Sequence, residues 1–284
     1  MPTTLHQLST RKGTVAYTRY GQGIPVLYLH GGHGNAYERI GHQGLNPSQF
    51  DLITPSRPGY LGSPLVQNHS PIQAAELMAA LMEQLGIKQY HVLAVSAAGP
   101  TAIALASLYP DRIQSLVLAS AVSKRWLKPS DEMYQHARRI FHPRREKWSW
   151  AAMRLFARLW PTGAARALLK SLSTSKNVVL QTADVQAIKQ MLLSQGSGDG
   201  LMADLEHETH KFQLNQISAP CLVVHSVNDK MVPPAHAEYA AATIPRIQLE
   251  WVQNNWGHLI WLGPEAALIC QKISFFIQSN QIKP

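Results

Sequence analysis

The stretch of sequence that decides the fold is Val92-Leu93-Ala94-Val95-Ser96-Ala97-Ala98-Gly99-Pro100. An apolar, strand-like pattern ends at the serine, and a helix-like pattern follows over residues 101–109. A strand, a sharp turn with serine at its apex and a helix make a nucleophile elbow, which lifts the hydroxyl above the sheet. Such a serine can attack a carbonyl carbon while nearby backbone N–H groups stabilise the oxyanion. Ser96 is therefore the candidate nucleophile, and the Ala97 N–H is a candidate oxyanion donor.

The elbow departs from the usual G-x-S-x-G signature. Ala94 and Ala98 stand where glycines are expected, and each adds one methyl group to a crowded turn. The alternative interpretation is a buried serine in an alanine-rich turn between a strand and a helix. This stretch alone leaves both interpretations open.

A glycine-rich loop supplies a second feature of the same chemistry. The apolar run 24–29 ends at His30, and Gly31-Gly32-His33-Gly34 follows directly. Glycines allow a sharp turn that exposes backbone N–H groups, and an HGG-type loop after an early strand forms the other half of an oxyanion hole. Phosphate-binding loops carry other glycine spacings, which are absent here. We therefore expect the Gly32 N–H to be the second oxyanion donor and His30 to be structural.

The acid and the base are expected downstream of the serine, because chains with a nucleophile elbow order the three residues serine, acid, histidine. Asp229 follows the buried, strand-like run 220–225, and His258 follows the alternating run 247–253. A plain turn former is the alternative role for Asp229. The other acid position, just after the strand-like run 113–120, offers no carboxylate before Asp131, so Asp229 is favoured.

Taken together, these motifs resemble the α/β-hydrolase superfamily over residues 14–123 and 212–280. The matching pieces are His30-Gly-Gly-His-Gly34, Ser56-Arg-Pro-Gly-Tyr60 with Gly62-Ser63, the Ser96 elbow, Asp229 followed by Val232-Pro233, and Gly257-His258. The resemblance implies an α/β-hydrolase fold, a doubly wound, mostly parallel sheet with a helical cap insertion. The alternation of apolar strand runs with helical patterns independently predicts such a sheet. The expected division is a core of residues 1–123 and 212–284 and a cap of residues 124–211.

The resemblance also implies a serine hydrolase that acts through Ser96, His258 and Asp229 and an acyl-enzyme intermediate. A carboxylic ester is the expected substrate. The same triad serves C–C bond hydrolases, proline iminopeptidase-like enzymes and acyltransferases, and these alternatives stay open. A non-catalytic ligand receptor on a hydrolase fold is the alternative of another class.

Charge is concentrated in the expected insertion. The whole chain has 284 residues and a formal net charge of +9, whereas residues 124–189 contain 14 lysines and arginines and only four carboxylates. A basic cap can attract an anionic small-molecule substrate, or it can be a solvated surface. The cations are dispersed among helical patterns and form no recognised nucleic-acid-binding motif, so no nucleic-acid partner is expected.

One helical pattern in the insertion carries an apolar face at positions 148, 152, 155, 156 and 159, with Arg154 and Arg158 on another face. The ordinary interpretation is a cap helix packed on its neighbours. The alternative is an interfacial or substrate-admitting face.

The remaining composition sets broad limits. Cys221 and Cys270 lie in apolar runs without metal-ligand spacing, so we expect free thiols, no metal and no cofactor. No run of about 18 apolar residues is present, so we expect no integral membrane segment. The amino terminus lacks a signal-peptide pattern, and a cytoplasmic location is the expectation. The oligomeric state is unknown at this stage.

Overall fold

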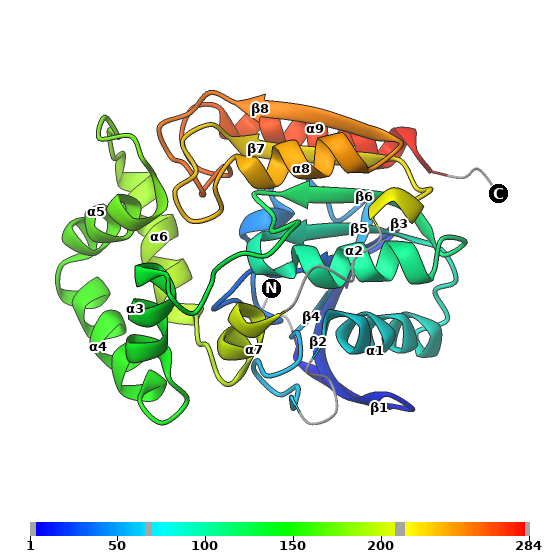
Figure 1. Cartoon of the computed structure of the whole chain (residues 1–284), viewed down its shortest axis with the longest axis horizontal. Helices are drawn as coiled ribbons and strands as arrows, with labels where there is room; N and C mark the ends of the chain where they lie inside the picture. Colours follow the sequence, from blue (N-terminus) through cyan, green and yellow to red (C-terminus); the bar gives the residue numbers. More distant parts are fainter. Residues whose placement is uncertain (1–3, 66–69, 208–213, 282–284) are drawn as a thin grey trace.

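A single eight-stranded sheet organises the molecule, with helices on both faces and a group of further helices beside one edge (Figure 1). The computed structural model describes residues 4–65, 70–207 and 214–281. The strands are β1 (His6–Thr10), β2 (Gly13–Gly21), β3 (Ile24–Leu29), β4 (Phe50–Pro55), β5 (Tyr90–Val95), β6 (Ile113–Ala119), β7 (Cys221–Ser226) and β8 (Ile247–Val252). The helices are α1 (Pro71–Gln84), α2 (Gly99–Leu108), α3 (Glu132–Phe141), α4 (Glu146–Leu159), α5 (Pro161–Leu172), α6 (Thr182–Ser194), α7 (Gly200–Glu206), α8 (Ala235–Thr243) and α9 (Ala266–Ser279).

The sheet is mostly parallel, as the sequence predicts. Its strand order is β1-β2-β4-β3-β5-β6-β7-β8. Only the β1–β2 and β2–β4 pairings are antiparallel, and the strands from β4 to β8 run parallel. The carboxyl ends of the parallel strands therefore meet along one edge, where such sheets place their ligands.

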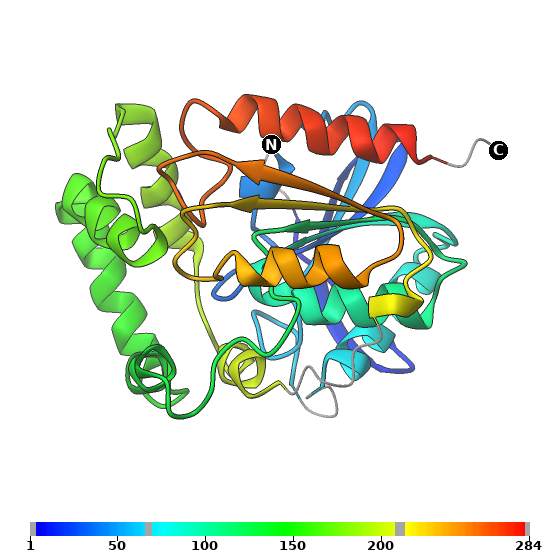
Figure 2. The same ribbon diagram turned by 45° about the horizontal axis from the view of Figure 1, so that its top comes forward.

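Each sheet face has its own apolar core, because successive strand side chains point to opposite faces. All six residues of β5 are buried. Val92 and Ala94 belong to the cluster that packs on α1, α2 and α8, whereas Leu93 and Val95 belong to the cluster that packs on α9. Figure 2 shows the sheet between these two layers. This double burial explains why β5 reads as a continuous apolar run in the sequence.

Helices α3 to α7 lie between β6 and β7 in the chain and beside the carboxyl edge of the sheet (Figures 1 and 2). We call α3–α7 the helical segment. It occupies the part of the chain in which the sequence predicts a cap, and its expected downstream boundary at residue 212 lies outside the described residues. Helices α4, α5 and α6 share an apolar cluster that includes Trp150, Ala165 and Ile188 and extends to Trp256 and Leu259 in the loop of His258.

The packing expected for the apolar face of α4 is wrong. Trp148, Leu155 and Leu159 are 79%, 55% and 77% exposed, while Trp150 and Ala157 on the opposite face are buried. The face that packs on the neighbouring helices is therefore narrow, and the apolar stripe read from the sequence points outward. In the part of the chain that the structure describes, no helix combines the length and hydropathy needed to cross a membrane.

Candidate active site

Ser96 occupies the turn between β5 and α2 in a left-handed conformation, with a φ of 54°. A non-glycine residue with such a φ is rare and strained, and it persists only where the surroundings hold it. Here the Val122 N–H donates to the Ser96 carbonyl at 3.0 Å. A Cβ added to Gly99 would lie 1.9 Å from the Val122 carbonyl oxygen, so glycine is required at that position. Ala94 and Ala98, which replace the two glycines of the usual signature, are both fully buried, and neither has a positive φ.

The glycine-rich loop after β3 lies directly against the elbow. A Cβ added to Gly31 would come within 3.0 Å of the Ser96 Cβ, and one added to Gly32 would lie 3.9 Å from the Ala97 Cβ. Within the described ranges, the Gly32 N–H donates to no protein group. Ala97 is in the first turn after the strand, where N–H groups have no acceptor within the helix. The structure thus brings both expected oxyanion donors beside the serine.

His30 is structural, in agreement with the sequence interpretation. Its Nε2 accepts from the Arg57 N–H at 2.9 Å, so its Nδ1 carries the proton and donates to the Gly31 carbonyl at 2.8 Å. Burial, helped by the Arg57 charge, lowers the pKa of His30 to about 3. The ring therefore stays neutral and holds the glycine-rich loop in place.

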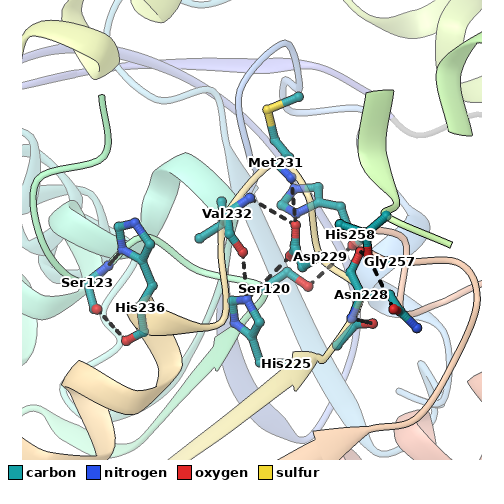
Figure 3. A network of polar contacts seen from close by, with 12 residues as sticks. Ser120, Ser123, His225, Asn228, Asp229, Met231, Val232, His236, Gly257 and His258 are labelled. Carbon is teal, nitrogen blue, oxygen red and sulfur yellow. Dashed lines mark hydrogen bonds and ion pairs between the residues drawn. The ribbon is translucent and has the colours of Figure 1, made fainter. Parts of the chain in front are cut away.

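His258 and Asp229 form a hydrogen-bonded pair at the carboxyl edge of the sheet (Figure 3). The His258 Nδ1 lies 2.8 Å from the Asp229 Oδ2, and a carboxylate oxygen can only accept this proton. In a neutral His258 ring this contact leaves the lone pair on Nε2. The Met231 and Val232 N–H groups both donate to the Asp229 Oδ1 at 2.9 Å, which fixes the carboxylate. Asp229 is 2% exposed.

Two further residues that support this pair were not found from the sequence. The His225 Nε2 donates to the Val232 carbonyl at 2.8 Å and lies 3.4 Å from the Asp229 Oδ2. Burial lowers the pKa of His225, so it adds no charge beside the carboxylate at neutral pH. Ser120, at the end of β6 with a φ of 48°, donates to the His258 carbonyl at 3.3 Å (Figure 3). The positive φ of Ser120 is a feature of one isolated residue, so no sequence pattern indicates it.

The end of α5 holds the acid loop and the histidine loop together. The Leu172 carbonyl accepts from the N–H groups of both Lys230 and His258, at 3.2 and 3.0 Å. Ser173 pairs with Asp229 as an isolated β-bridge. Gly257 has a φ of 57°, and an added Cβ would lie 2.5 Å from the Leu172 carbonyl oxygen. The helical segment is therefore part of the scaffold of the site.

A buried ion pair joins the helical segment to the opposite side of the site. The Arg57 guanidinium binds both carboxylate oxygens of Asp204 on α7 at 2.6 Å, and the Tyr60 hydroxyl donates to the same carboxylate at 2.6 Å. Burial raises the pKa of Asp204, but the charge and hydrogen bonds of Arg57 more than offset it and hold that pKa below its usual value. Because Arg57 Nε also donates to the His30 carbonyl, the pair connects α7 to the glycine-rich loop.

We expect Asp204→Asn to lower the free energy of unfolding by about 3–5 kcal/mol, because it leaves the buried Arg57 charge uncompensated. Urea denaturation at neutral pH measures this loss. The matched control is Asp199→Asn, which removes an exposed carboxylate just before the same helix and should change stability by less than about 0.5 kcal/mol. Equal effects of the two variants would contradict a structural role for the pair.

Ser96 and His258 line one cavity of about 120 Å³ beneath the helical segment. Most of its walls are apolar side chains, of which Leu168, Leu172 and Met191 come from α5 and α6. Within the described part of the chain, no lysine or arginine lines it. The cations of the helical segment therefore act on a bound molecule only from a distance.

The cavity is also lined by polar groups that no sequence pattern indicates. Glu38 lines the cavity, and burial raises the pKa of its carboxyl. The Tyr28 Oη and the Trp261 Nε1 are buried without a hydrogen-bond partner among the described groups, and both residues line the same cavity. Unpartnered buried donors are costly, so these two groups are suited to bind a polar part of a ligand.

The described residues contain no cluster of three or more histidine, cysteine or acidic side chains that could hold a metal ion. Cys221 and Cys270 are buried free thiols. Besides Glu38, Tyr28 and Trp261, the polar groups of the cavity include the Ser96 hydroxyl and the His258 imidazole, with the Gly32 and Ala97 N–H groups nearby.

Comparison with known proteins agrees with this architecture. The family model described as alpha/beta hydrolase fold matches residues 24–263. "Uncharacterized hydrolase YcgS" from Bacillus subtilis (strain 168) is 36% identical over 274 residues, which cover 94% of this chain and 96% of the relative. The solved "Alpha/beta hydrolase fold protein from Nakamurella multipartita" is 25% identical, with a TM-score of 0.81 over 98% of this chain and 100% of that one.

A shorter match is to the "2-hydroxy-6-oxo-6-phenylhexa-2,4-dienoate hydrolase" of Comamonas testosteroni. It is 30% identical over 112 residues, or 37% of this chain and 38% of that protein. The family match over most of the chain, the sheet order and the elbow lead to one conclusion: this chain belongs to the α/β-hydrolase fold family and is a hydrolase of that fold.

Proposed function

We propose that the protein is a serine hydrolase that cleaves a small carboxylic ester through an acyl-enzyme intermediate. The observation that carries the proposal is the strained Ser96 in one cavity with His258, whose Nδ1 is hydrogen-bonded to Asp229. The helical segment acts as the cap over this cavity. With 120 Å³ the cavity is smaller than the usual range for drug-sized ligands, so a short acyl group is the expected occupant.

In the proposed mechanism, His258 Nε2 takes the Ser96 proton as the hydroxyl oxygen attacks the ester carbonyl. Asp229 keeps the imidazole in the tautomer with a proton on Nδ1 and stabilises the imidazolium that forms. The N–H groups of Gly32 and Ala97 stabilise the oxyanion, and each such donor typically lowers the barrier by about 3 kcal/mol. The alcohol leaves with a proton from His258. A water molecule, deprotonated by His258, then attacks the acyl carbon and frees the acid.

A fluorophosphonate probe tests this proposal directly. We expect the probe to label Ser96 stoichiometrically, because the activated hydroxyl attacks phosphorus as it would attack a carbonyl carbon. Mass spectrometry of the digested protein locates the adduct, and Ser96→Ala should abolish it. The matched control is Ser120→Ala, which should still be labelled, because the Ser120 hydroxyl donates to the His258 carbonyl and does not line the cavity. Labelling that persists in Ser96→Ala, or none in the native protein, would refute the proposal.

Turnover separates the proposed enzyme from a ligand receptor on the same fold. A panel of p-nitrophenyl esters should show repeated turnover, fastest with short acyl chains. The Comamonas testosteroni match supports a second candidate, hydrolysis of a 2-hydroxy-6-oxo-dienoate, because that relative is named as a hydrolase of such a compound. Its substrate carries a carboxylate, for which the described cavity walls offer no lysine or arginine. Cleavage of that dienoate with no ester turnover would favour the second candidate.

A further inference from the structure

Helix α4 carries an exposed apolar stripe, which we define as Trp148, Leu155, Phe156, Leu159 and Trp160. Their exposed fractions are 79%, 55%, 40%, 77% and 62%. Trp148, Leu155 and Leu159 follow helical spacing, with the small, exposed Ala152 between them, so they lie on one face. Single exposed apolar residues are ordinary, but a contiguous group of large ones marks an interaction surface.

The opposite face of α4 packs against the rest of the helical segment. Trp150 and Ala157 are buried against α5 and α6, and the Trp150 Nε1 donates to Ser197. Arg154 is also committed, because its Nη2 donates to the Gln195 carbonyl at 2.7 Å. In Figure 1, α4 lies on the side of the helical segment away from the sheet. The α4 stripe therefore has no other part of the described chain to pack on.

Cations lie along one edge of the α4 stripe and in the segment that leads into α4. Lys147 and Arg158 are both exposed and, being eleven residues apart, lie along the same edge of the helix. Four more exposed arginines precede α4 or end α3. Together with Lys147 and Arg158, these four arginines form a group that we call the cation belt. Its members are Arg138, Arg139, Arg144, Arg145, Lys147 and Arg158. Its members make no ion pair with any residue that the structure describes.

We propose that the α4 stripe and the cation belt dock the protein onto an anionic lipid bilayer. An amphipathic helix with tryptophan and leucine on one face and basic residues at its border lies in the plane of the membrane interface. The tryptophan rings suit the headgroup level, and the cations gain from the negative surface potential. This docking is peripheral and does not rest on the proposed ester chemistry.

Charge selects the bilayer over a second copy of this chain as the occupant. Residues 124–189 carry ten more cations than carboxylates, so two such faces would repel each other. An anionic surface is attracted to the same charge. The exposed apolar residues on α9 provide a contrast, because Lys272, the one lysine or arginine within α9 itself, is paired with Glu250.

Sedimentation with sucrose-loaded vesicles tests the proposal. We expect the full-length protein to bind vesicles of equal parts phosphatidylglycerol and phosphatidylcholine at low salt and to bind pure phosphatidylcholine at least tenfold more weakly. Salt at 0.5 M should release it, because screening weakens attraction at an exposed surface. Trp148→Gln, Leu155→Gln and Leu159→Gln combined should lower the partition coefficient about 1,000-fold, since each large apolar side chain contributes roughly a factor of ten when buried.

The cations are tested separately. Lys147→Gln with Arg158→Gln should lower binding about 25-fold, since each cation near an anionic surface contributes about a factor of five. The matched apolar control is Leu268→Gln with Phe275→Gln, which lie 56% and 68% exposed on α9. The matched charge control is Lys88→Gln with Arg246→Gln, which precede β5 and β8 at the opposite edge of the sheet. Both controls should bind as the native protein does.

Three outcomes would overturn the proposal. The first is no binding of the native protein to the anionic vesicles. The second is equal loss of binding in the α4 variants and their controls. The third is a native dimer in analytical ultracentrifugation that the triple α4 variant converts to a monomer without any vesicle binding, which would assign the stripe to a second copy. Fluorophosphonate labelling of Ser96 without vesicles is independent of all three, so failure of the two proposals can be told apart.

Discussion

Ser96→Ala and His258→Ala should each lower kcat for p-nitrophenyl butyrate by about 10⁴ to 10⁶-fold, and the double mutant should lose no more than the worse single mutant. The reason is that the serine is a weak nucleophile without the imidazole, and the imidazole has no proton to accept without the serine. A remaining rate of about 10³ to 10⁴ over water is expected, because the Gly32 and Ala97 donors stay in place. Single-turnover and steady-state kinetics on the purified variants measure these losses.

Asp229→Asn should cost less, on the order of 10⁴-fold in kcat, because the imidazole remains but its favoured tautomer changes. The matched control is Asp51→Asn, which removes another buried carboxylate, paired with Arg19 between β2 and β4 and away from the cavity. Circular dichroism and thermal unfolding show whether each variant is folded. Multiplicative losses in the Ser96–His258 double mutant, or full activity in Asp229→Asn, would contradict the proposed triad.

The residues at the carboxyl edge of the sheet could be predicted from the sequence, because local patterns determine their positions. An apolar strand followed by a turn fixes where the residue after each strand lies, so Ser96, Asp229 and His258 could be placed at one edge without a structure. The chain order then selected Asp229. The sequence gives no sign that Gly99 is required, because the crowding there comes from the distant Val122 carbonyl.

The parts of the site that escaped prediction depend on contacts between residues far apart in the chain. The Leu172 carbonyl accepts hydrogen bonds from the backbone N–H groups of Lys230 and His258. A backbone acceptor of this kind cannot be recognised from a side-chain pattern in the sequence. For α4, periodicity located an apolar face correctly but could not say what covers it. Its narrow packing face, with Trp150 and Ala157, was sufficient to attach the helix, and the wider apolar stripe was left exposed.

Acid should unfold this protein more steeply than its carboxylates alone would predict. Burial lowers the pKa of five histidines to about 3 or 4: His30, His33, His42, His91 and His236. Burial also lowers the pKa of His225. These rings are neutral in the folded state and titrate near pH 6.5 once unfolded. The unfolded state therefore binds more protons below pH 6.5, and stability falls as the pH falls through that value toward 4.

The expected loss is large. At pH 5 an unfolded histidine lies about 1.5 units below its pKa, so each buried neutral ring costs about 2 kcal/mol relative to neutral pH. Five such rings together cost on the order of 10 kcal/mol, which is comparable to the whole stability of a domain. Glu38 acts in the opposite direction, since burial raises its pKa, but it is a single group with a smaller effect.

Urea denaturation at several pH values between 7.5 and 5 measures this dependence as the slope of unfolding free energy against pH. His91→Gln should reduce the slope by about one proton, because His91 is buried on β5 away from the cavity and titrates only after unfolding. The matched control is His136→Gln, which removes an exposed histidine of α3 and should change the slope less than His91→Gln does. A native protein whose stability stays flat from pH 7.5 to 5 would show that these rings are accessible to protons in the folded state. In that case the packing that keeps His30 neutral, and with it the fixed glycine-rich loop beside Ser96, would also be in doubt.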